Sequence, residues 1–422
     1  MGASTGLTRQ GDGAPLRQAP NLRMQAAATL VCSVVGNLAA LAATAWLIHH
    51  LGSEPFGRMA LLSGAAGSLS SFAGSGFALY ALRSLSIDSG PRAAAGLAAA
   101  QLGSQLLASV VSLSALAVTL IVPSDWSTAE VAMAAVILHC MTADAQYKSA
   151  LAGRQEVLWL ATGTLSGALA LAIAQASGAL LAGPRGYLGG MAVGTATQAL
   201  VSWWVFRRTE RGSSIVPMSQ VLGLLSERPL LSFVVPATLS ASLVPLAHWA
   251  ANAVAAAKGS YADVAILSVA LQFFNMVMFV PTVMNKIVLP RTIRADRIDG
   301  AARNRTLRHS SWMLCSLVAP LLVWALQAPI TTVYRFDHPS SMAVLYCFTA
   351  AAAVACMLIP MSNRLVSQHR IWLTLVGNAA WAGCYVGVAW SLPGAALAAA
   401  QALLIAYIVN FALLAPMALR RD

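Results

Sequence analysis

The sequence predicts an all-α polytopic membrane protein with about 12 transmembrane helices. Its 422 residues are 58% hydrophobic and only 9% charged, with a mean hydropathy of +0.70. A soluble domain of this composition would have too little polar surface to face water. The apolar residues also gather in long stretches, and one crossing of a bilayer needs roughly 20 such residues. Twelve helices with short loops therefore use nearly the whole chain.

Twelve apolar stretches are long enough to cross the bilayer, and they lack the alternating pattern of barrel strands. Because backbone groups in hydrocarbon must bond to one another, each stretch is predicted to be a helix. The predicted spans are 24–49, 56–82, 93–122, 129–150, 157–182, 187–206, 231–257, 262–289, 310–333, 342–366, 371–392 and 395–419.

The basic residues predict the orientation of these helices. Of the 26 Lys and Arg residues, all but four lie at the termini or in every second loop. The four exceptions are Arg58, Arg185, Lys258 and Arg335. Because cationic loops resist translocation, both termini are predicted to be cytoplasmic. The net charge of +12 lies beside the spans and not in one aromatic-rich patch, which excludes nucleic acid as a partner and favours anionic membrane lipids.

The longest polar interruption divides the chain into two halves of six spans each. The predicted parts are a disordered cytoplasmic N-terminus (1–22), an N-lobe (23–206), a cytoplasmic linker (207–230), a C-lobe (231–419) and a cytoplasmic C-terminus (420–422). The N-terminal segment lacks an apolar core, so it does not have the pattern of a cleavable signal peptide. Within the linker, one face of a short interfacial helix would carry Val221, Leu222, Leu224 and Leu225. A disordered loop is the alternative.

The two halves share a short repeated pattern. The first span ends in Gly52 and Ser53 with an acid at Glu54, and the seventh ends in Gly259 and Ser260 with an acid at Asp263. The chain then re-enters through Leu-Leu-Ser or Ile-Leu-Ser. Internal repeats are typical of secondary transporters, whose substrate site lies between the repeated halves. With six spans in each half, the repeat would be a parallel one.

Several chemistries are excluded by what the sequence lacks. All six cysteines lie in apolar stretches and none forms a C-x-x-C pair, so we expect buried thiols and no disulfide framework or zinc site. The sequence contains no P-loop, so ATP is not expected to bind, and no cofactor is predicted. The outer loops are too short to carry the paired acids of a membrane glycosyltransferase, so the protein is not expected to be an enzyme.

The residues around the first turn resemble a known family. Leu51, Gly52, Phe56 and Gly57 form the pattern LG-x-x-x-FG, and the second span closes in GSGFALYALRSLS. The seventh span continues the likeness with an early Pro236, and FVPTVMNKIVLPRTIRA ends the eighth before a basic loop. These segments resemble the polysaccharide and O-antigen flippases of the multidrug/oligosaccharidyl-lipid/polysaccharide exporter superfamily.

The resemblance implies two six-helix lobes that form a V around a central cavity. It implies a transporter that flips an undecaprenyl-pyrophosphate-linked oligosaccharide across the bacterial inner membrane by alternating access. A polysaccharide polymerase and glycosyltransferases would then be partners. The alternative within the superfamily is a MATE-like multidrug or metabolite antiporter, which would need a titratable carboxylate such as Asp144. A major-facilitator carrier is a further alternative, but its usual signature is absent from SLSIDSGPRAAAG.

The few charged side chains inside the spans are candidates for contact with a substrate, because such charges are costly there. Arg83 ends the second span, and its guanidinium matches phosphate oxygens; the alternative is an anchor that reaches the lipid headgroups. Lys286, near the cytoplasmic end of the eighth span, has the same two interpretations. Asp144 and Lys148 are four residues apart and are predicted to form an ion pair, either structural or exchanging partners during transport.

The seventh span carries the other two candidates. His248 and Asn252 lie four residues apart and share one helix face. A membrane imidazole forms hydrogen bonds or responds to protons near neutral pH, and a packing role is the alternative. The predicted cavity residues are therefore Arg83, Asp144, Lys148, His248, Asn252 and Lys286.

Overall fold

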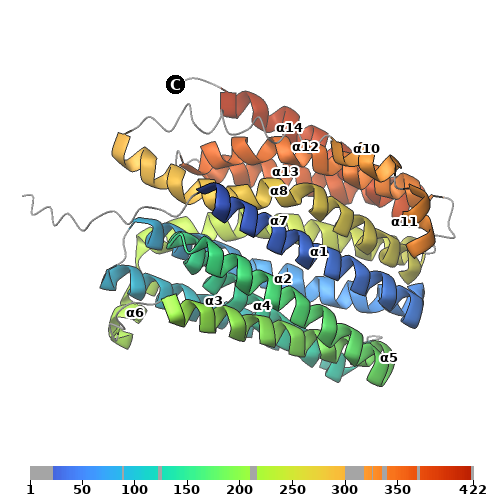
Figure 1. The fold of residues 1–422 in the computed structure, drawn as a ribbon, viewed down its shortest axis with the longest axis horizontal. Coiled ribbons are helices and arrows are strands. Elements are labelled where there is room, and N and C mark those ends of the chain that lie inside the picture. The colour runs from blue at the N-terminus through green and yellow to red at the C-terminus, as the bar shows by residue number, and fades with distance from the viewer. Residues whose placement is uncertain are drawn as a thin grey trace, which may run out of the picture.

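The protein, seen in a computed structural model, is a bundle of long helices that run along one common direction (Figure 1). The structure describes residues 22–87, 90–121, 126–209, 216–299, 318–325, 327–334, 340–367 and 371–419. Within these ranges every regular element is a helix. The helices are α1 (Leu22–Leu51), α2 (Ser53–Ile87), α3 (Pro91–Ile121), α4 (Thr128–Gly153), α5 (Val157–Thr209), α6 (Met218–Leu225), α7 (Arg228–Lys258), α8 (Tyr261–Asp299), α10 (Val318–Ala325), α11 (Gln327–Tyr334), α12 (Ser341–Ser367), α13 (Ile371–Ser391) and α14 (Ala396–Leu419).

The observed helices follow the predicted spans closely. In the described ranges, eight helices are long and apolar enough to cross a membrane. The predicted ninth span, 310–333, lies partly outside the described residues, and its described part forms α10 and α11. The predicted N-terminal tail, apart from its last residue, and the predicted C-terminus also lie outside them. The prediction of an all-helical membrane protein is confirmed.

The fifth element, α5, consists of two antiparallel passes joined by a sharp reversal. Ala182 and Gly183 leave the helical conformation, Gly183 with φ +59°, and Pro184 starts the return. Proline suits a first helical turn because the amide hydrogen it lacks would have no partner there. The two passes touch at Gly178 and Gly186, where a Cβ on either glycine would collide with the carbonyl oxygen of the other. The passes before and after residue 183 match the predicted spans 157–182 and 187–206.

The helices form two groups that follow chain order. In Figure 1 the blue-to-green helices of the first half lie below the yellow-to-red helices of the second half. In the first half, α4 packs on α2 and on the second pass of α5, and α1 packs on α5. In the second half, α12, α13 and α14 pack together and against α7 and α8. These groups are the two lobes of helices.

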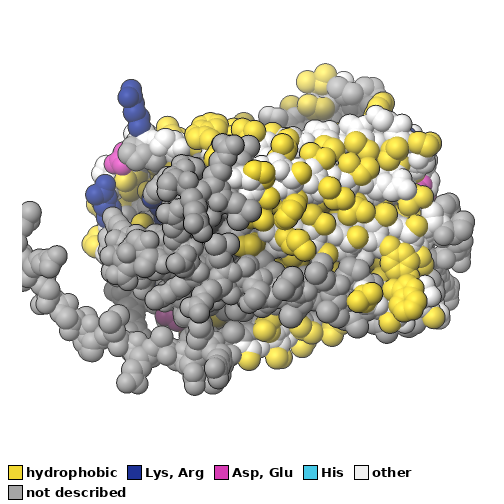
Figure 2. All heavy atoms as spheres, turned by 90° about the horizontal axis from the view of Figure 1, so that it is seen from above, with side chains coloured by type: hydrophobic (Ala, Val, Ile, Leu, Met, Phe, Trp, Pro, Cys, Tyr) yellow, Lys and Arg dark blue, Asp and Glu magenta, His cyan; other side chains and the backbone are white. Residues whose placement is uncertain are grey.

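The outer surface of the bundle is apolar, as a lipid-facing surface should be. Large side chains such as Ile121 and Leu181 are 80% and 86% exposed. Figure 2 shows hydrophobic side chains spread over the length of the bundle, with the visible Lys and Arg side chains at one end. An apolar surface of this extent indicates contact with a membrane. The protein is therefore a multi-pass membrane protein.

The linker contains the short helix α6, but its apolar face differs from the predicted one. Val221 and Leu224 are buried, and with Leu225 they pack among residues of α2, α3 and α7. Leu222 is 54% exposed and points away from them. The prediction that it shares their face was wrong, because Leu222 is turned by about 160° from Leu224 around the helix. Residues 210–215 of the linker lie outside the described part.

Candidate functional site

The two lobes meet along α2, which lies against both α7 and α8. Gly57 and Gly76 allow this approach, because a Cβ at Gly57 would collide with the Tyr261 carbonyl oxygen and one at Gly76 with Thr238. Between them, the Ser68 hydroxyl donates a 2.8 Å hydrogen bond to the carbonyl oxygen of Pro245. Small residues allow packed helices to come close together. We call the α2 contact with α7 and α8 the lobe seam.

The end of the seam that is predicted to face away from the cytoplasm is held by polar contacts. The Glu54 carboxylate accepts hydrogen bonds from the backbone N–H groups of Tyr261 (3.3 Å) and Ala262 (2.9 Å), the first residues of α8. Alongside, the Gln272 amide of α8 donates to the Thr44 hydroxyl of α1 at 2.6 Å. A helix N-terminus presents unsatisfied N–H groups and a partial positive charge, so a carboxylate is a favourable partner. We call this region, from Glu54 to the start of α8, the outer contact.

Two further hydrogen bonds join α1 to the second half at the same end. The Tyr334 hydroxyl of α11 donates to the carbonyl oxygen of Leu41 at 3.3 Å. The His49 ring nitrogen Nε2 lies 2.8 Å from the carbonyl oxygen of Val333. At this end, both α1 and α2 of the first half therefore contact the second half.

The predicted pair of Asp144 and Lys148 is present in α4. The Lys148 ammonium lies 2.7 Å from Asp144 Oδ2, and the Ser202 hydroxyl in the second pass of α5 donates to Asp144 Oδ1 at 2.6 Å. The two charged side chains are 19% and 13% exposed. The carboxylate therefore has a charged and a neutral partner, and it ties α4 to α5. Any exchange of these partners during transport stays a prediction.

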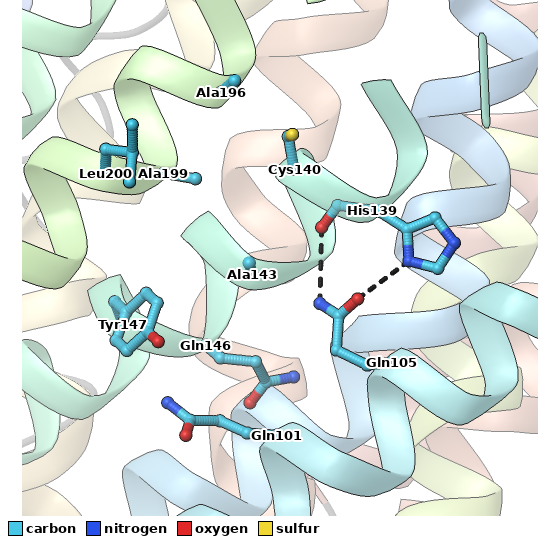
Figure 3. A pocket seen from close by; sticks show the side chains of 10 residues that line it. All are labelled: Gln101, Gln105, His139, Cys140, Ala143, Gln146, Tyr147, Ala196, Ala199 and Leu200. Atoms are coloured by element: carbon cyan, nitrogen blue, oxygen red, sulfur yellow. Dashed lines mark hydrogen bonds between the residues drawn. The ribbon is translucent and has the colours of Figure 1, made fainter. Parts of the chain in front are cut away.

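Beside this pair, a cavity of about 440 Å³ lies between α3, α4 and the second pass of α5. Its lining is Gln101, Gln105, His139, Cys140, Ala143, Gln146, Tyr147, Ala196, Ala199 and Leu200. Figure 3 shows the polar side chains on α3 and α4, and Ala196, Ala199 and Leu200 on α5. We call this cavity the α3–α5 groove. It carries neither a carboxylate nor an ammonium or guanidinium group among its lining residues.

Two glutamines of the groove are fixed by their neighbours. Gln105 binds His139 twice, with its amide 3.3 Å from the His139 carbonyl oxygen and its oxygen 2.8 Å from the ring nitrogen Nδ1 (Figure 3). Gln146 is fully buried, and its amide donates a 3.0 Å hydrogen bond to the carbonyl oxygen of Gly74 in α2. The Gln146 oxygen has no hydrogen-bond partner among the described residues. A buried acceptor without a donor is costly, so this oxygen favours a ligand that donates.

The other predicted site residues lie elsewhere. Arg83 is partly buried, near the end of α2 that is predicted to be cytoplasmic, with its guanidinium 5.1 Å from the Phe233 ring centre across the seam. Asn252 is partly buried in α7. Lys286 belongs to α8, but its side chain lies outside the described part of the structure. The structure therefore brings Asp144 and Lys148 together and leaves Arg83 at a separate place on the seam.

His248 belongs to an aromatic cluster inside the second half. The ring centres of Tyr385, Trp381 and Phe274 lie 5.3, 5.6 and 6.1 Å from that of His248. Trp381 and Tyr385 are fully buried, and neither the indole N–H nor the phenol hydroxyl has a hydrogen-bond partner among the described residues. This environment favours the packing interpretation of His248, and a substrate role stays a prediction.

Residues missed by the sequence analysis are mostly uncharged. Gln101, Gln105 and Gln146 were not predicted, because a glutamine in an apolar span can equally well bind a neighbouring helix. Glu54 was noted only as part of the repeated turn, and its partner lies about 200 residues away in the chain. Among the described residues, no group of three or more His, Cys, Asp or Glu side chains could hold a metal ion.

Comparison with solved structures identifies the fold. The chain is similar to an outward-facing multidrug resistance MATE family transporter of the MOP superfamily, with 13% identity, a TM-score of 0.66 and 93% of each chain covered. It is similar to a Vibrio cholerae MATE transporter, with 15% identity, a TM-score of 0.63 and coverage of 93% of this chain and 96% of that one. It is also similar to a MOP superfamily transporter from Pyrococcus furiosus, with 16% identity, a TM-score of 0.63 and coverage of 93% of this chain and 94% of that one. No family model and no curated protein matches the sequence.

The chain is thus a multi-pass membrane protein with the two-lobed helical fold seen in MATE transporters of the MOP superfamily. Identities of 13–16% are too low to transfer a substrate or a mechanism. The lobe seam and the α3–α5 groove are the features of the structure that bear on function.

Proposed function

We propose that the protein is a transporter that moves a small organic molecule across the cytoplasmic membrane of a bacterium by alternating access, as a MATE-like exporter. The observation that carries the proposal is the lobe seam. Two helical lobes meet there through small residues and a few polar bonds, and such an interface can open and close as rigid bodies move. The fold shared with multidrug MATE transporters over 93% of the chain supports the same function.

The groove supports a small substrate more than a large one. Its volume of about 440 Å³ is within the range of sites for drug-sized molecules. Its lining has no cation to meet a pyrophosphate, which a lipid-linked oligosaccharide would require. Flipping of an undecaprenyl-pyrophosphate-linked oligosaccharide is therefore the second candidate. The position of Arg83 on the seam favours it, since a guanidinium there would meet a phosphate passing between the lobes.

Accumulation of fluorescent probes in an efflux-deficient bacterium tests the first candidate. N-phenyl-1-naphthylamine, which is uncharged, and ethidium, which is a cation, would be the two probes. Cells that express the protein should accumulate less of at least one probe than cells with an empty vector. Gly76→Leu should abolish the difference, because its side chain would collide with Thr238 and Val234 and prevent the lobes from meeting. Gly223→Leu is the matched control, since no atom lies within 4 Å of its Cβ.

The same protein in proteoliposomes separates the two candidates. A fluorescent polyprenyl-diphosphate-linked sugar would be placed in the inner leaflet, and its appearance in the outer leaflet would be measured. Flipping of this lipid without any export of either probe would replace the first candidate by the second. The predicted cytoplasmic location of both termini can be tested with alkaline phosphatase fused to the C-terminus, which should be inactive.

A further inference from the structure

We propose that the α3–α5 groove takes an uncharged amphiphilic molecule directly from the bilayer, with Gln146 Oε1 accepting a hydrogen bond from its polar group. The proposal rests on the proposed transport function and names the class of substrate. It places the binding site in the wall of the N-lobe, away from the lobe seam. Three properties of the groove carry it: its direction, its depth and its neutral polar lining.

The groove opens away from the other lobe. One face of α4 packs on α2, where Thr142 contacts Gly74, and α2 in turn packs on α7 and α8. The adjoining face of α4, with His139, Ala143 and Tyr147, lies about 60–140° around the helix from Thr142 and forms the floor of the groove. Its α5 wall includes Leu200, which is 63% exposed. The groove therefore lies beside the α2 contact and opens past the exposed Leu200 to the surrounding lipid.

Gln101 and His139 of the groove lie well inside the membrane, and Gln146 lies about 10 Å from the end of α4 at Gly153. Gln101 is ten residues into α3, which begins at Pro91, so at 1.5 Å per residue it lies about 15 Å along the helix. His139 is a similar distance into α4, which begins at Thr128 and runs the opposite way. The hydrocarbon core is about 30 Å thick. Amide and imidazole groups that face lipid at this depth are costly unless a ligand binds them.

The lining determines the chemistry of the ligand. Gln146 is fully buried and its amide is fixed on Gly74, so its free oxygen is held as an acceptor at the bottom of the groove. The Gln105 amide group is bound to the carbonyl oxygen and the ring nitrogen Nδ1 of His139. With no charged group in the lining, an ion would lose its hydration without compensation. The fitting molecule is uncharged, donates one hydrogen bond to Gln146 and places its apolar part against Tyr147 and Leu200.

A matched pair of probes tests the hydrogen bond. N-phenyl-1-naphthylamine has one N–H donor, and its N-methyl derivative has none. Binding of the two radiolabelled compounds to the full chain in lipid nanodiscs would be measured, with empty nanodiscs subtracted. The donor compound should bind about fivefold more tightly, as one neutral hydrogen bond predicts. Gln146→Leu should remove this preference. Gln401→Leu, at an exposed position in α14, is the matched control and should keep it.

A second variant covers the case in which Gln146→Leu does not fold. Leu200→Trp adds volume at an exposed position and fills the groove without disturbing the core, so it should weaken binding of both compounds at least tenfold. Unchanged binding in Leu200→Trp, or an unchanged preference in a folded Gln146→Leu, would overturn the proposal. So would a dimer in nanodiscs or detergent that Leu200→Trp dissociates, because a second copy would then occupy the groove.

Binding and transport can fail separately. If the donor compound binds as expected but cells that express the protein do not export it, the proposed function fails and the binding site stands. If cells export the compound and Leu200→Trp exports it equally well, the transport function stands and the assignment of the groove fails.

Discussion

Removing the Glu54 carboxylate should open the outer contact. The carboxylate accepts hydrogen bonds from two N–H groups at the start of α8, across the two lobes. Loss of a side chain that satisfies a helix N-terminus costs about 1 kcal/mol. Glu54 is exposed, so solvent screens its charge and the charge adds little to this free energy. About 1 kcal/mol corresponds to a roughly fivefold change in the ratio of open to closed molecules.

The assay uses a cysteine that is hidden while the outer contact is closed. Ala265 in α8 is 2% exposed and packs with Phe56 and Met59 of α2. An Ala265→Cys protein would be treated with a membrane-impermeant maleimide, and the labelling of the parent chain would be subtracted. If opening and closing are fast compared with labelling, the rate follows the open population. Glu54→Ala should therefore raise the rate about fivefold.

Charge and position can be separated with two further variants. Glu54→Gln keeps an acceptor but loses the charge, so its rate should fall between those of the parent and Glu54→Ala. High salt should raise the rate of the parent more than that of Glu54→Gln, because salt screens an exposed charge. Glu227→Ala is the matched control, an acid at the start of α7 without a side-chain capping bond. Equal rates in the parent and Glu54→Ala, or an equal rise in Glu227→Ala, would refute the reasoning.

Three further predictions concern stability, each measured by thermal unfolding in detergent. Asp144→Asn should destabilise the protein by about 2 kcal/mol, because Lys148 then keeps a partly buried charge without its counter-ion, and adding Lys148→Met should recover part of the loss. Gly183→Ala should lower the free energy of unfolding by about 1 kcal/mol, because alanine is strained at a φ of +59°. Gly387→Ala should leave this free energy unchanged or raise it, because Gly387 is helical and a Cβ there would meet open space. Tyr385→Phe should not destabilise the protein, because its buried hydroxyl has no partner among the described residues; a loss above about 1 kcal/mol would reveal one.

The parts of the fold that depend on local sequence could be predicted. Span limits follow from runs of apolar residues, and the reversal in α5 follows from Gly183 and Pro184 between two such runs. The Asp144–Lys148 pair was predictable because the two residues lie one helical turn apart. Ser202, the third member, could not be found, because its contact with Asp144 depends on how α4 meets α5.

The groove was not predictable for a different reason. The hydrophobic pattern gives the number of helices but not which helices stay apart, and the groove exists because α3 and the second pass of α5 flank α4 without closing over it. A glutamine in a span equally well binds a neighbouring helix, so Gln105 and Gln146 carry no distinct signal in the sequence. Charged residues were predicted to contact a substrate because charged side chains are rare in transmembrane helices. In this structure the candidate ligand groups are neutral.

The repeated turns explain why Glu54 and its counterpart Asp263 should behave differently. Asp263 accepts a hydrogen bond from the Ser260 N–H at 3.0 Å and lies 3.4 Å from the Ala396 nitrogen at the start of α14. Nearby, Lys258 donates to the carbonyl oxygens of Ala389, Trp390 and Leu392 at the end of α13. These bonds all lie within one lobe.

The outer end of the second lobe should therefore move as one body, and the bonds of Asp263 should survive when the lobes separate. Asp263→Asn should lower the unfolding temperature, because it weakens the start of α8 and its tie to α14. It should leave the labelling of Ala265→Cys unchanged at temperatures well below unfolding. If Asp263→Asn instead raises the labelling rate as much as Glu54→Ala does, the lobes do not separate between α2 and α8, and the outer contact is not a boundary between rigid bodies.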